Sequence, residues 1–382
     1  MLVRADFNVP MDNGQITDDG RIRASLPTLR ALSDRGARLV VCSHLGRPGG
    51  HVELRYSLAP VAIRLSQLLG REVRFAADTV GLQAQSAVAG LFPGDIVLLE
   101  NLRFNPGETS KDDAVRGAFA DQLAALADLY VGDGFAAMHR RHASVFDVPG
   151  RLPHAAGYLV QAELASLRRL TTQPEPPYVL VLGGAKVADK LGVIGNLLGL
   201  VDTVLVGGVM AFPFLAGLGH PIGASPTTPD EVETARELLL KAAAIGTDIV
   251  LPSDLVVAQG ASSDAPRRIV SGSVPPGMLG LDIGPESVKL FESVLEGART
   301  VFWNGPVGVF EVDAFASGTR EIARALAASH AYTVVGGGDT GAAIRVLGFT
   351  DDQFGHVSTG GGASLEYLEG RSLPGLEALG SD

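Results

Sequence analysis

YVLVLGGAKVADK, residues 178–190, joins a strand-like run to a helix-like run through two glycines. The five residues before the glycines are apolar, as in a strand that is buried on both faces. Lys186 and Lys190 lie four residues apart, which puts them on one face of the first helical turns. Lysines near a helix N-terminus oppose the helix dipole, so we expect this pair to meet an anion. The alternative is that both are solvated surface lysines.

The second half of the chain repeats this arrangement. Strand-like runs end in glycine clusters at 183–184, 207–208, 336–338 and 360–362. In open parallel sheets, ligands bind beyond the carboxyl ends of the strands, where glycine lets the backbone approach them closely. The set predicts a phosphate or nucleotide site. Tight strand-to-helix turns without a ligand are the alternative explanation.

The first half also alternates strand-like and helix-like segments. Short apolar or alternating runs at 2–9, 37–43, 71–77, 95–102 and 128–134 are separated by amphipathic segments. This alternation predicts β–α–β units around a parallel sheet.

A proline-rich segment separates the two halves. TTQPEPPY, residues 171–178, has three prolines in eight positions and indicates a linker. We therefore predict an α/β protein with two doubly wound, Rossmann-like parallel-sheet domains, residues 1–158 and 177–366. A helix and hinge within 159–176 would join them.

The charge of the chain excludes some functions. Its 382 residues carry 31 Lys and Arg against 42 Asp and Glu, a net charge of -11, and no long basic run. That balance argues against a nucleic-acid partner. One cysteine cannot form an internal disulfide, which fits a reducing compartment, and we expect a cytoplasmic protein. Residues 1–158 are neutral, so the whole negative excess falls in the second half.

One stretch resembles a membrane span in composition. Residues 203–229 contain no Asp, Glu, Lys or Arg. However, the stretch contains a short apolar run, a Gly-Gly break and Pro213, which favour a buried strand, turn and helix. We therefore expect no membrane partner.

VVGGGDTGAA, residues 334–343, contains a GxGxxG match at 336–341 after a strand-like run. This is the outline of a dinucleotide site, but the acidic residue expected about 20 positions later is missing. An NAD-linked oxidoreductase therefore stays open with weak support. Asp339 places a carboxylate among backbone donors that favour phosphate, which predicts a Mg²⁺ ligand. A helix N-cap is the alternative role.

Basic and polar residues also recur just past the strands of the first half. They are Asp6, Asn8, Arg21, His44, Arg47, Arg103, His139 and Arg140. Arginine binds phosphate and carboxylate through two parallel hydrogen bonds. Any one arginine could be an ordinary surface residue, but several at one sheet edge predict a pocket for a small anionic substrate.

With these motifs the chain resembles the phosphoglycerate kinase family almost from end to end. The matching stretches are VRADFNVP (3–10), SHLGRP (43–48), LLENLRF (98–104), HRRHAS (139–144), GGAKVADK (183–190), WNGPVGVFE (303–311) and GGGDT (336–340). The resemblance implies reversible, Mg²⁺-dependent phosphoryl transfer between 1,3-bisphosphoglycerate and ADP, giving 3-phosphoglycerate and ATP in glycolysis. It also implies closure of the two domains and electrostatic stabilisation of the transferring group, with no general base.

The resemblance assigns residues to three roles. It implies that Arg21, Lys186 and Lys190 are catalytic. On the 3-phosphoglycerate side it places Asp6, Asn8, Arg21, His44, Arg47, Arg103 and Arg140. On the nucleotide side it places Gly184, Ala185, Lys186, Lys190, Gly280, Asn304, Pro306, Gly308, Glu311, Gly337, Gly338, Asp339 and Thr340. Glu311 would bind the ribose hydroxyls, and Asp339 would bind the metal.

The family pattern also sets expectations for the rest of the chain. It implies a monomer whose residues 367–382 pack back onto the first domain. The sequence starts within the family's first strand, and Val209 replaces a glycine near the expected adenine site. We expect the first departure to affect stability more than the site, and Val209 to narrow the pocket or resist its backbone shape. A nucleotide- or phosphosugar-binding protein without catalysis is therefore an alternative, beside the NAD-linked oxidoreductase.

Overall fold

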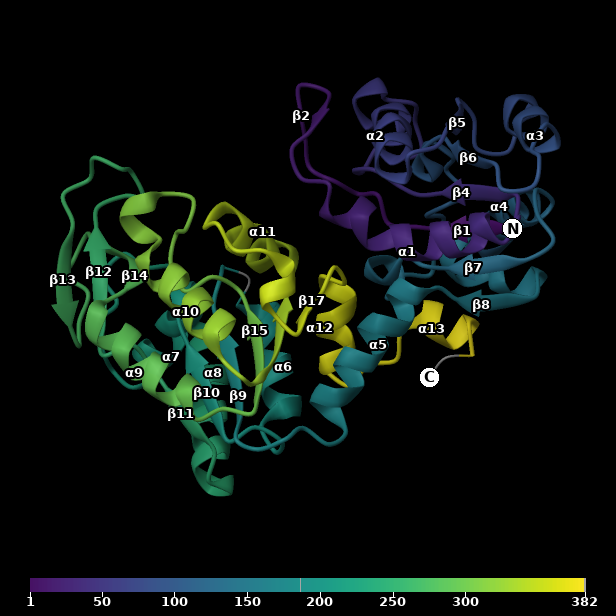
Figure 1. Cartoon of the computed structure of the whole chain (residues 1–382). Helices are drawn as coiled ribbons and strands as arrows, with labels where there is room; N and C mark the ends of the chain where they lie inside the picture. The colour runs from purple at the N-terminus through teal and green to yellow at the C-terminus, as the bar shows by residue number, and fades with distance from the viewer. Residues whose placement is uncertain (186, 381–382) are drawn as a thin grey trace. The chain divides into compact units, whose positions relative to one another are not determined.

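The computed structural model describes residues 1–185 and 187–380, shown in Figure 1. Contacts divide the chain into two compact units, Met1–Leu164 together with the segment from Ser372, and Ala165–Arg371. Each unit contains a six-stranded sheet whose strand pairs are all parallel. The α/β class and the Rossmann-like sheets are therefore as the sequence predicts.

The sheet of the first unit has the order β5-β6-β4-β1-β7-β8. Its strands are β1 Leu2–Arg4, β4 Leu39–Cys42, β5 Val73–Ala76, β6 Ile96–Leu99, β7 Tyr130–Gly132 and β8 His154–Ala156. β1 is central and pairs with β4 on one side and β7 on the other. The strand order therefore reverses next to β1, which is where open parallel sheets bind ligands.

Helices surround this sheet (Figure 1). They are α1 Gly20–Asp34, α2 Ala59–Leu69, α3 Leu82–Ala89, α4 Asp113–Ala124, the first half of α5 Tyr158–Thr171, and α13 Pro374–Ala378. A short hairpin, β2 Met11–Asp12 and β3 Gln15–Ile16, leads from β1 to α1. Short helical turns lie at Leu54–Tyr56, Leu102–Phe104, Phe135–Ala137, Ala143–Asp147 and Pro149–Arg151.

The parallel sheet of the second unit has the order β11-β10-β9-β15-β16-β17. Its strands are β9 Tyr178–Leu182, β10 Thr203–Val206, β11 Asp248–Val250, β15 Thr300–Asn304, β16 Tyr332–Gly336 and β17 His356–Val357. β9 and β15 are completely buried, which explains the apolar runs at 178–182 and 301–303. The strand order reverses between them.

Besides the second half of α5, seven helices of the described chain belong to the second unit. They are α6 Ala188–Leu197, α7 Ala211–Gly217, α8 Pro229–Ile245, α9 Pro285–Glu296, α10 Ser317–Ala328, α11 Gly338–Val346 and α12 Gly362–Leu368. Short turns lie at Gly208–Met210, Asp313–Phe315 and Asp351–Gln353. Thr228 and Glu231 form a capping box at the start of α8, and Gly246 ends that helix with a φ of 80°.

The second unit also contains a small antiparallel sheet, β13-β12-β14, that the sequence pattern did not predict. Its strands are β12 Asp254–Ala258, β13 Arg268–Ser271 and β14 Leu279–Ile283. β13 is largely exposed and carries little apolar periodicity, so it gives a weak signal.

The uncharged stretch 203–229 folds as a strand, a turn and a helix, as predicted. It forms β10, the short turn at Gly208–Met210 and α7. In the part of the chain that the structure describes, no helix is long and apolar enough to cross a membrane.

Candidate active site

A cluster of basic side chains, the arginine cluster, lies at the carboxyl end of the first unit's sheet. Arg4 ends β1, His44 follows β4, Arg103 follows β6, and Arg140 follows β7. The structure therefore brings together side chains that are up to 136 positions apart in the sequence. Their charges act on one another, since Arg4, Arg103 and Arg140 all lower the pKa of His44.

Asp6 and Asn8 form a rigid frame beside this cluster. Asp6 is buried and pairs with Arg21, which lies in the first turn of α1. Its other oxygen accepts a hydrogen bond from the backbone N–H of Asn8 at 3.2 Å. The Asn8 side-chain oxygen accepts from Gly46 N–H at 2.9 Å. These bonds tie the loop after β1 to the loop after β4.

Arg103 is the most deeply buried of the predicted arginines, with 6% of its surface exposed. Its Nη1 donates to the Gly46 carbonyl at 2.6 Å. Among the described residues, its Nε and Nη2 have no hydrogen-bond partner. Burial and the neighbouring Arg140 lower the pKa of Arg103 to about 10. A buried guanidinium with two unpartnered donor nitrogens and a neighbouring arginine is suited to bind an anion.

Two further predicted residues lie at the edge of this cluster. Arg140 is half-buried, and its Nε lies 3.0 Å from His139 Nε2. Arg47 is exposed on the loop after β4, and the described residues give its side chain no hydrogen bond or ion pair. Arg47 is therefore the predicted residue that the structure connects least to the others.

The histidines of the cluster are neutral at pH 7. Burial, aided by Arg140, lowers the pKa of His139 to about 4. Burial, aided by Arg103, lowers the pKa of His142 to about 3. Burial together with Arg4 and Arg103 holds the pKa of His44 well below its usual range. The positive charge of the site therefore comes from arginine alone.

Three residues that support this cluster were not predicted from the sequence: Arg4, Glu108 and Ser144. Arg4 is completely buried in the central strand, and its guanidinium reaches both Ser144 and His44. Glu108 is completely buried and accepts two hydrogen bonds from Ser144. An arginine within the apolar run of β1 was the available signal for Arg4, because charged residues are rarely fully buried without a purpose.

In the second unit, glycine loops interlock where the strand order reverses. Gly183 N–H donates to the Asn304 carbonyl at 3.0 Å, and Gly184 N–H donates to the Pro306 carbonyl at 2.7 Å. Gly184 and Gly305 have φ angles of 78° and 97°, in the region that favours glycine. A Cβ on Gly183 would lie 2.2 Å from the Pro306 oxygen. Glycine is therefore required here for the loops themselves to fit.

Lys190 links the two loops that follow β9 and β15. It lies in the first turn of α6 and is 6% exposed. Its Nζ donates to the Gly183 carbonyl at 2.5 Å and lies 3.4 Å from the Asn304 carbonyl. The alternative, a solvated surface lysine, is therefore wrong for Lys190. Lys186, predicted as its partner, lies outside the described residues.

A third loop joins this arrangement at the start of α11. The Thr340 hydroxyl accepts from Gly305 N–H at 2.7 Å and donates to the Gly336 carbonyl at 2.7 Å. It is completely committed to the backbone of two loops. The Asn304 side chain is 2% exposed, and its Nδ2 has no partner among the described residues. A Cβ built on Gly337 would lie 3.1 Å from that nitrogen.

The start of α11 is open to solvent. Gly337 has a φ of 88°, and a Cβ on Gly338 would meet nothing within 4 Å. Asp339 is exposed in the first turn and does not cap the helix. The N-cap role for Asp339 is therefore wrong, because Gly337 occupies that position. No group of three metal-ligating side chains exists among the described residues, so a metal here would depend on ligand oxygens.

The remaining predicted nucleotide residues border these loops. Ala185 and Glu311 are exposed, Pro306 and Gly308 are buried, and Gly280 is half-buried. A Cβ on Gly308 would lie 2.1 Å from Asp282 Oδ1, so only glycine fits there.

Val209 fits the backbone at its position. It lies half-buried in the short turn Gly208–Met210, and the preceding Gly208 provides the positive φ of 57°. The expectation that a valine resists the backbone shape here is therefore wrong.

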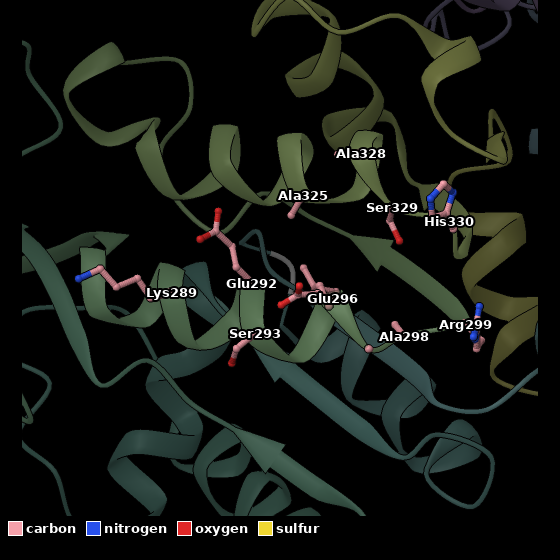
Figure 2. Close-up of a pocket in the computed structure, with 12 residues that line it drawn as sticks. Lys289, Glu292, Ser293, Glu296, Ala298, Arg299, Ala325, Ala328, Ser329 and His330 are labelled. Carbon is pink, nitrogen blue, oxygen red and sulfur yellow. The ribbon is translucent and has the colours of Figure 1, made fainter.

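A surface hollow of about 670 Å³ lies elsewhere in the second unit. It is lined by α9, the C-terminal part of α10 and the residues that precede β15 and β16. In Figure 2 the charged groups of Lys289 and Arg299 lie at opposite ends of the hollow. They do not converge on one point, and the hollow lies at the amino ends of these strands, away from the glycine loops.

Comparison with known proteins gives one family. The profile of the phosphoglycerate kinase family matches residues 1–371. A phosphoglycerate kinase of Salinispora arenicola is 61% identical over 382 residues, covering 99% of this chain and 95% of that protein. The phosphoglycerate kinase of Streptomyces griseus is 58% identical over 385 residues, covering 99% of this chain and 96% of that protein.

Solved structures give the same result. The chain is similar to phosphoglycerate kinase from Coxiella burnetii, with a TM-score of 0.85 and 40% identity over 99% of this chain and 95% of that one. It is also similar to the enzyme from Pyrococcus horikoshii, with a TM-score of 0.90 and 33% identity over 100% of this chain and 95% of that one.

Proposed function

The chain belongs to the phosphoglycerate kinase family, and on that premise we propose which of its residues carry the reaction. The enzyme is a glycolytic phosphotransferase that moves a phosphoryl group between 1,3-bisphosphoglycerate and ADP, giving 3-phosphoglycerate and ATP. The assignment to this family replaces the two alternatives, an NAD-linked oxidoreductase and a binding protein without catalysis.

We propose that the first unit binds 3-phosphoglycerate through its arginine cluster. The observation that supports this most is Arg103, whose buried guanidinium has two nitrogens without a partner among the described residues. A phosphate or carboxylate would accept from them and relieve the repulsion between Arg103 and Arg140. Asp6 and Asn8 hold the surrounding loops, Arg21 approaches from α1, and His44, Arg47 and Arg140 complete the substrate side.

The second unit would then bind the nucleotide on its interlocked glycine loops. The helix start at Gly337–Thr340 offers backbone N–H groups to phosphate, and the orphan Asn304 Nδ2 supplies a further donor. Gly184, Ala185, Gly280, Pro306 and Gly308 shape the surrounding surface, and the exposed Glu311 carboxylate suits the ribose hydroxyls.

A Mg²⁺ ion fits Asp339. Its exposed carboxylate, beside a glycine start that leaves open space, matches the way Mg²⁺ uses one or two carboxylates plus phosphate oxygens. Bound there, the ion would neutralise part of the charge on the nucleotide phosphates.

The reaction needs positioned cations rather than a base. In the direction of ATP use, a carboxylate oxygen of 3-phosphoglycerate forms a bond to the γ-phosphorus. The bond from that phosphorus to the bridging oxygen breaks, and ADP leaves. The carboxylate is already ionised, so no proton is removed. Arg21 would neutralise the transferring group, as would Lys186, which keeps this role on family resemblance alone. We propose the same role for Lys190, whose Nζ would have to leave the Gly183 carbonyl to reach the phosphoryl group.

The test uses Arg103→Gln in a coupled assay with 3-phosphoglycerate and MgATP. Losing one charge-assisted contact of about 1.5–3 kcal/mol raises KM for 3-phosphoglycerate roughly 10- to 150-fold. KM for MgATP should stay within about twofold, because the second unit is untouched. Arg71→Gln is the matched control, since Arg71 is exposed, pairs with Asp34 and precedes β5 at the amino end of the sheet. An unchanged KM for 3-phosphoglycerate would reject the role of Arg103.

We also propose a monomeric, cytoplasmic enzyme whose domains close during turnover. These features rest on the family resemblance. Sedimentation velocity at two protein concentrations tests the first, and small-angle scattering with and without both substrates tests the closure.

A further inference from the structure

A buried chain of hydrogen bonds runs behind the arginine cluster, from Glu108 to His44. Glu108 Oε1 lies 2.7 Å from Ser144 Oγ, and Glu108 Oε2 accepts from Ser144 N–H at 3.0 Å. Arg4 Nε donates to the same Ser144 Oγ at 2.9 Å. Arg4 Nη2 lies 3.0 Å from His44 Nδ1. Glu108, Ser144 and Arg4 are 0% exposed, and His44 is 6% exposed.

The chemistry of the donors fixes the direction of each bond. A guanidinium nitrogen can only donate, so the Ser144 oxygen must accept from Arg4. The single hydroxyl proton of Ser144 points at Glu108 Oε1, 2.7 Å away. Both Glu108 oxygens therefore accept, one from the Ser144 hydroxyl and one from the Ser144 N–H. This arrangement suits an ionised carboxylate, whose charge offsets that of the buried Arg4.

His44 lies at the end of this hydrogen-bond chain opposite Glu108. Because Arg4 Nη2 can only donate, His44 Nδ1 must carry a lone pair rather than a proton. The neutral ring then holds its proton on Nε2. A doubly protonated ring would place N–H against N–H. Asp6 Oδ1 lies 3.9 Å from Nδ1, too far to hold a proton there.

We propose that Glu108 and Ser144, acting through Arg4, are positioning residues that hold His44 as the neutral tautomer with its proton on Nε2. This inference rests on the proposed substrate side of the first unit. It makes His44 a directed hydrogen-bond donor to the anionic substrate rather than a cation. Glu108 thereby affects substrate binding without touching the substrate.

The surrounding charges agree with this assignment. The charged and titratable groups that act on His44 are Arg4, Arg103, Arg140, His142 and Asp6. Burial and the arginines hold the pKa of His44 well below its usual range, so the ring stays neutral. Burial raises the pKa of Glu108, while Arg4 and the two Ser144 bonds lower it. Burial outweighs these bonds, so the pKa of Glu108 is raised overall, and its assignment as a carboxylate rests on the Ser144 hydroxyl and N–H that donate to it.

Nitrogen-15 NMR of the histidine-labelled enzyme tests this directly. The chain has 8 histidines, and a His44→Gln spectrum assigns the resonance of interest. Long-range proton–nitrogen couplings distinguish the two neutral tautomers and the imidazolium. We expect the Nε2-protonated form at pH 7 without substrate. A His44 signal from the Nδ1-protonated form or from the imidazolium would overturn the proposal.

Two variants test the role of Glu108. Glu108→Gln replaces one acceptor by an amide that faces a Ser144 donor, so the chain of bonds must rearrange. Ser144→Ala removes one oxygen, adds no volume, and serves if Glu108→Gln does not fold. Both should mix the His44 tautomers and raise KM for 3-phosphoglycerate roughly tenfold, the effect of one such bond. An unchanged tautomer in a folded variant would overturn the role.

Glu72→Gln is the control, because Glu72 is exposed just before β5. The NMR readout requires no turnover, so it separates this inference from the proposed function. If His44 is protonated on Nε2 but the Arg103→Gln variant binds 3-phosphoglycerate normally, the proposed substrate site of the first unit is rejected. The positioning of His44 by Glu108, Ser144 and Arg4 is then kept. If the Arg103→Gln variant loses affinity but His44 is not protonated on Nε2, only the positioning of His44 is rejected.

Discussion

Asp282 should make the stability of the second unit fall as pH rises from 5 to 7. This carboxyl lies in β14, is 2% exposed, and accepts from Ile283 and Gly318 N–H at 2.9 Å each. Burial nevertheless raises its pKa from 3.8 to about 7. The folded unit therefore retains a proton up to pH near 7 that the unfolded chain loses near 4.

The difference between the two pKa values makes the free energy of unfolding depend on pH. Between these two pKa values the folded state binds about one more proton, so stability decreases by about 1.4 kcal/mol per pH unit. From pH 5 to 7 the loss is about 2.5 kcal/mol, and above pH 8 the contribution is flat. With a urea m-value of about 2–3 kcal/mol/M, the unfolding midpoint falls by roughly 1 M.

Trp303 provides the assay. It is the only tryptophan of the chain and is 0% exposed in β15, within the same unit as Asp282. Urea unfolding followed by its fluorescence at pH 5, 6, 7 and 8 gives the slope. Asp282→Asn should be less stable, because one N–H loses its acceptor, but its midpoint should vary less with pH. Equal pH slopes in the two proteins would refute the reasoning.

Three further changes have defined outcomes. Lys190→Met should lower kcat in the coupled assay on the order of 10²–10³-fold, as expected for one lost transition-state donor, and a kcat within twofold of wild type would exclude a catalytic role. Gly308→Ala would place a Cβ 2.1 Å from Asp282 Oδ1. It should therefore destabilise the second unit by about 1–3 kcal/mol, measured through Trp303. Thr340→Val leaves Gly305 N–H and the Gly336 carbonyl without partners. It should weaken ADP binding in calorimetry, while 3-phosphoglycerate binding stays unchanged.

Much of the fold follows from the sequence because buried parallel strands have a strong signal. The apolar runs of β9 and β15 and the glycines after them predicted both the sheet and its ligand-binding edge. The antiparallel strand β13 escaped prediction because most of it is exposed, so no apolar pattern marks it.

The candidate site was predicted less completely. Side chains that end a strand or follow it, such as Asp6 and Arg103, were predicted as a group because parallel strands bring their carboxyl ends together. Glu108 and Ser144 were missed because they belong to loops that meet only in the folded unit. The bonds that the Thr340 hydroxyl makes to the backbones of two loops were not predicted either. Such pairings depend on three-dimensional contacts between loops, which sequence spacing does not encode.

The return of the C-terminal segment to the first unit has a consequence for biosynthesis. Leu376 is 1% exposed, and a Cβ on Gly375 would lie 2.5 Å from the Met138 sulfur. The last strand of that sheet ends at Ala156, yet α13 leaves the ribosome more than 200 residues later. At 5–20 residues per second this is a delay of roughly 10–45 s. For that time the surface of the nascent first domain around Met138 and Val145 lacks the segment that covers it in the complete fold.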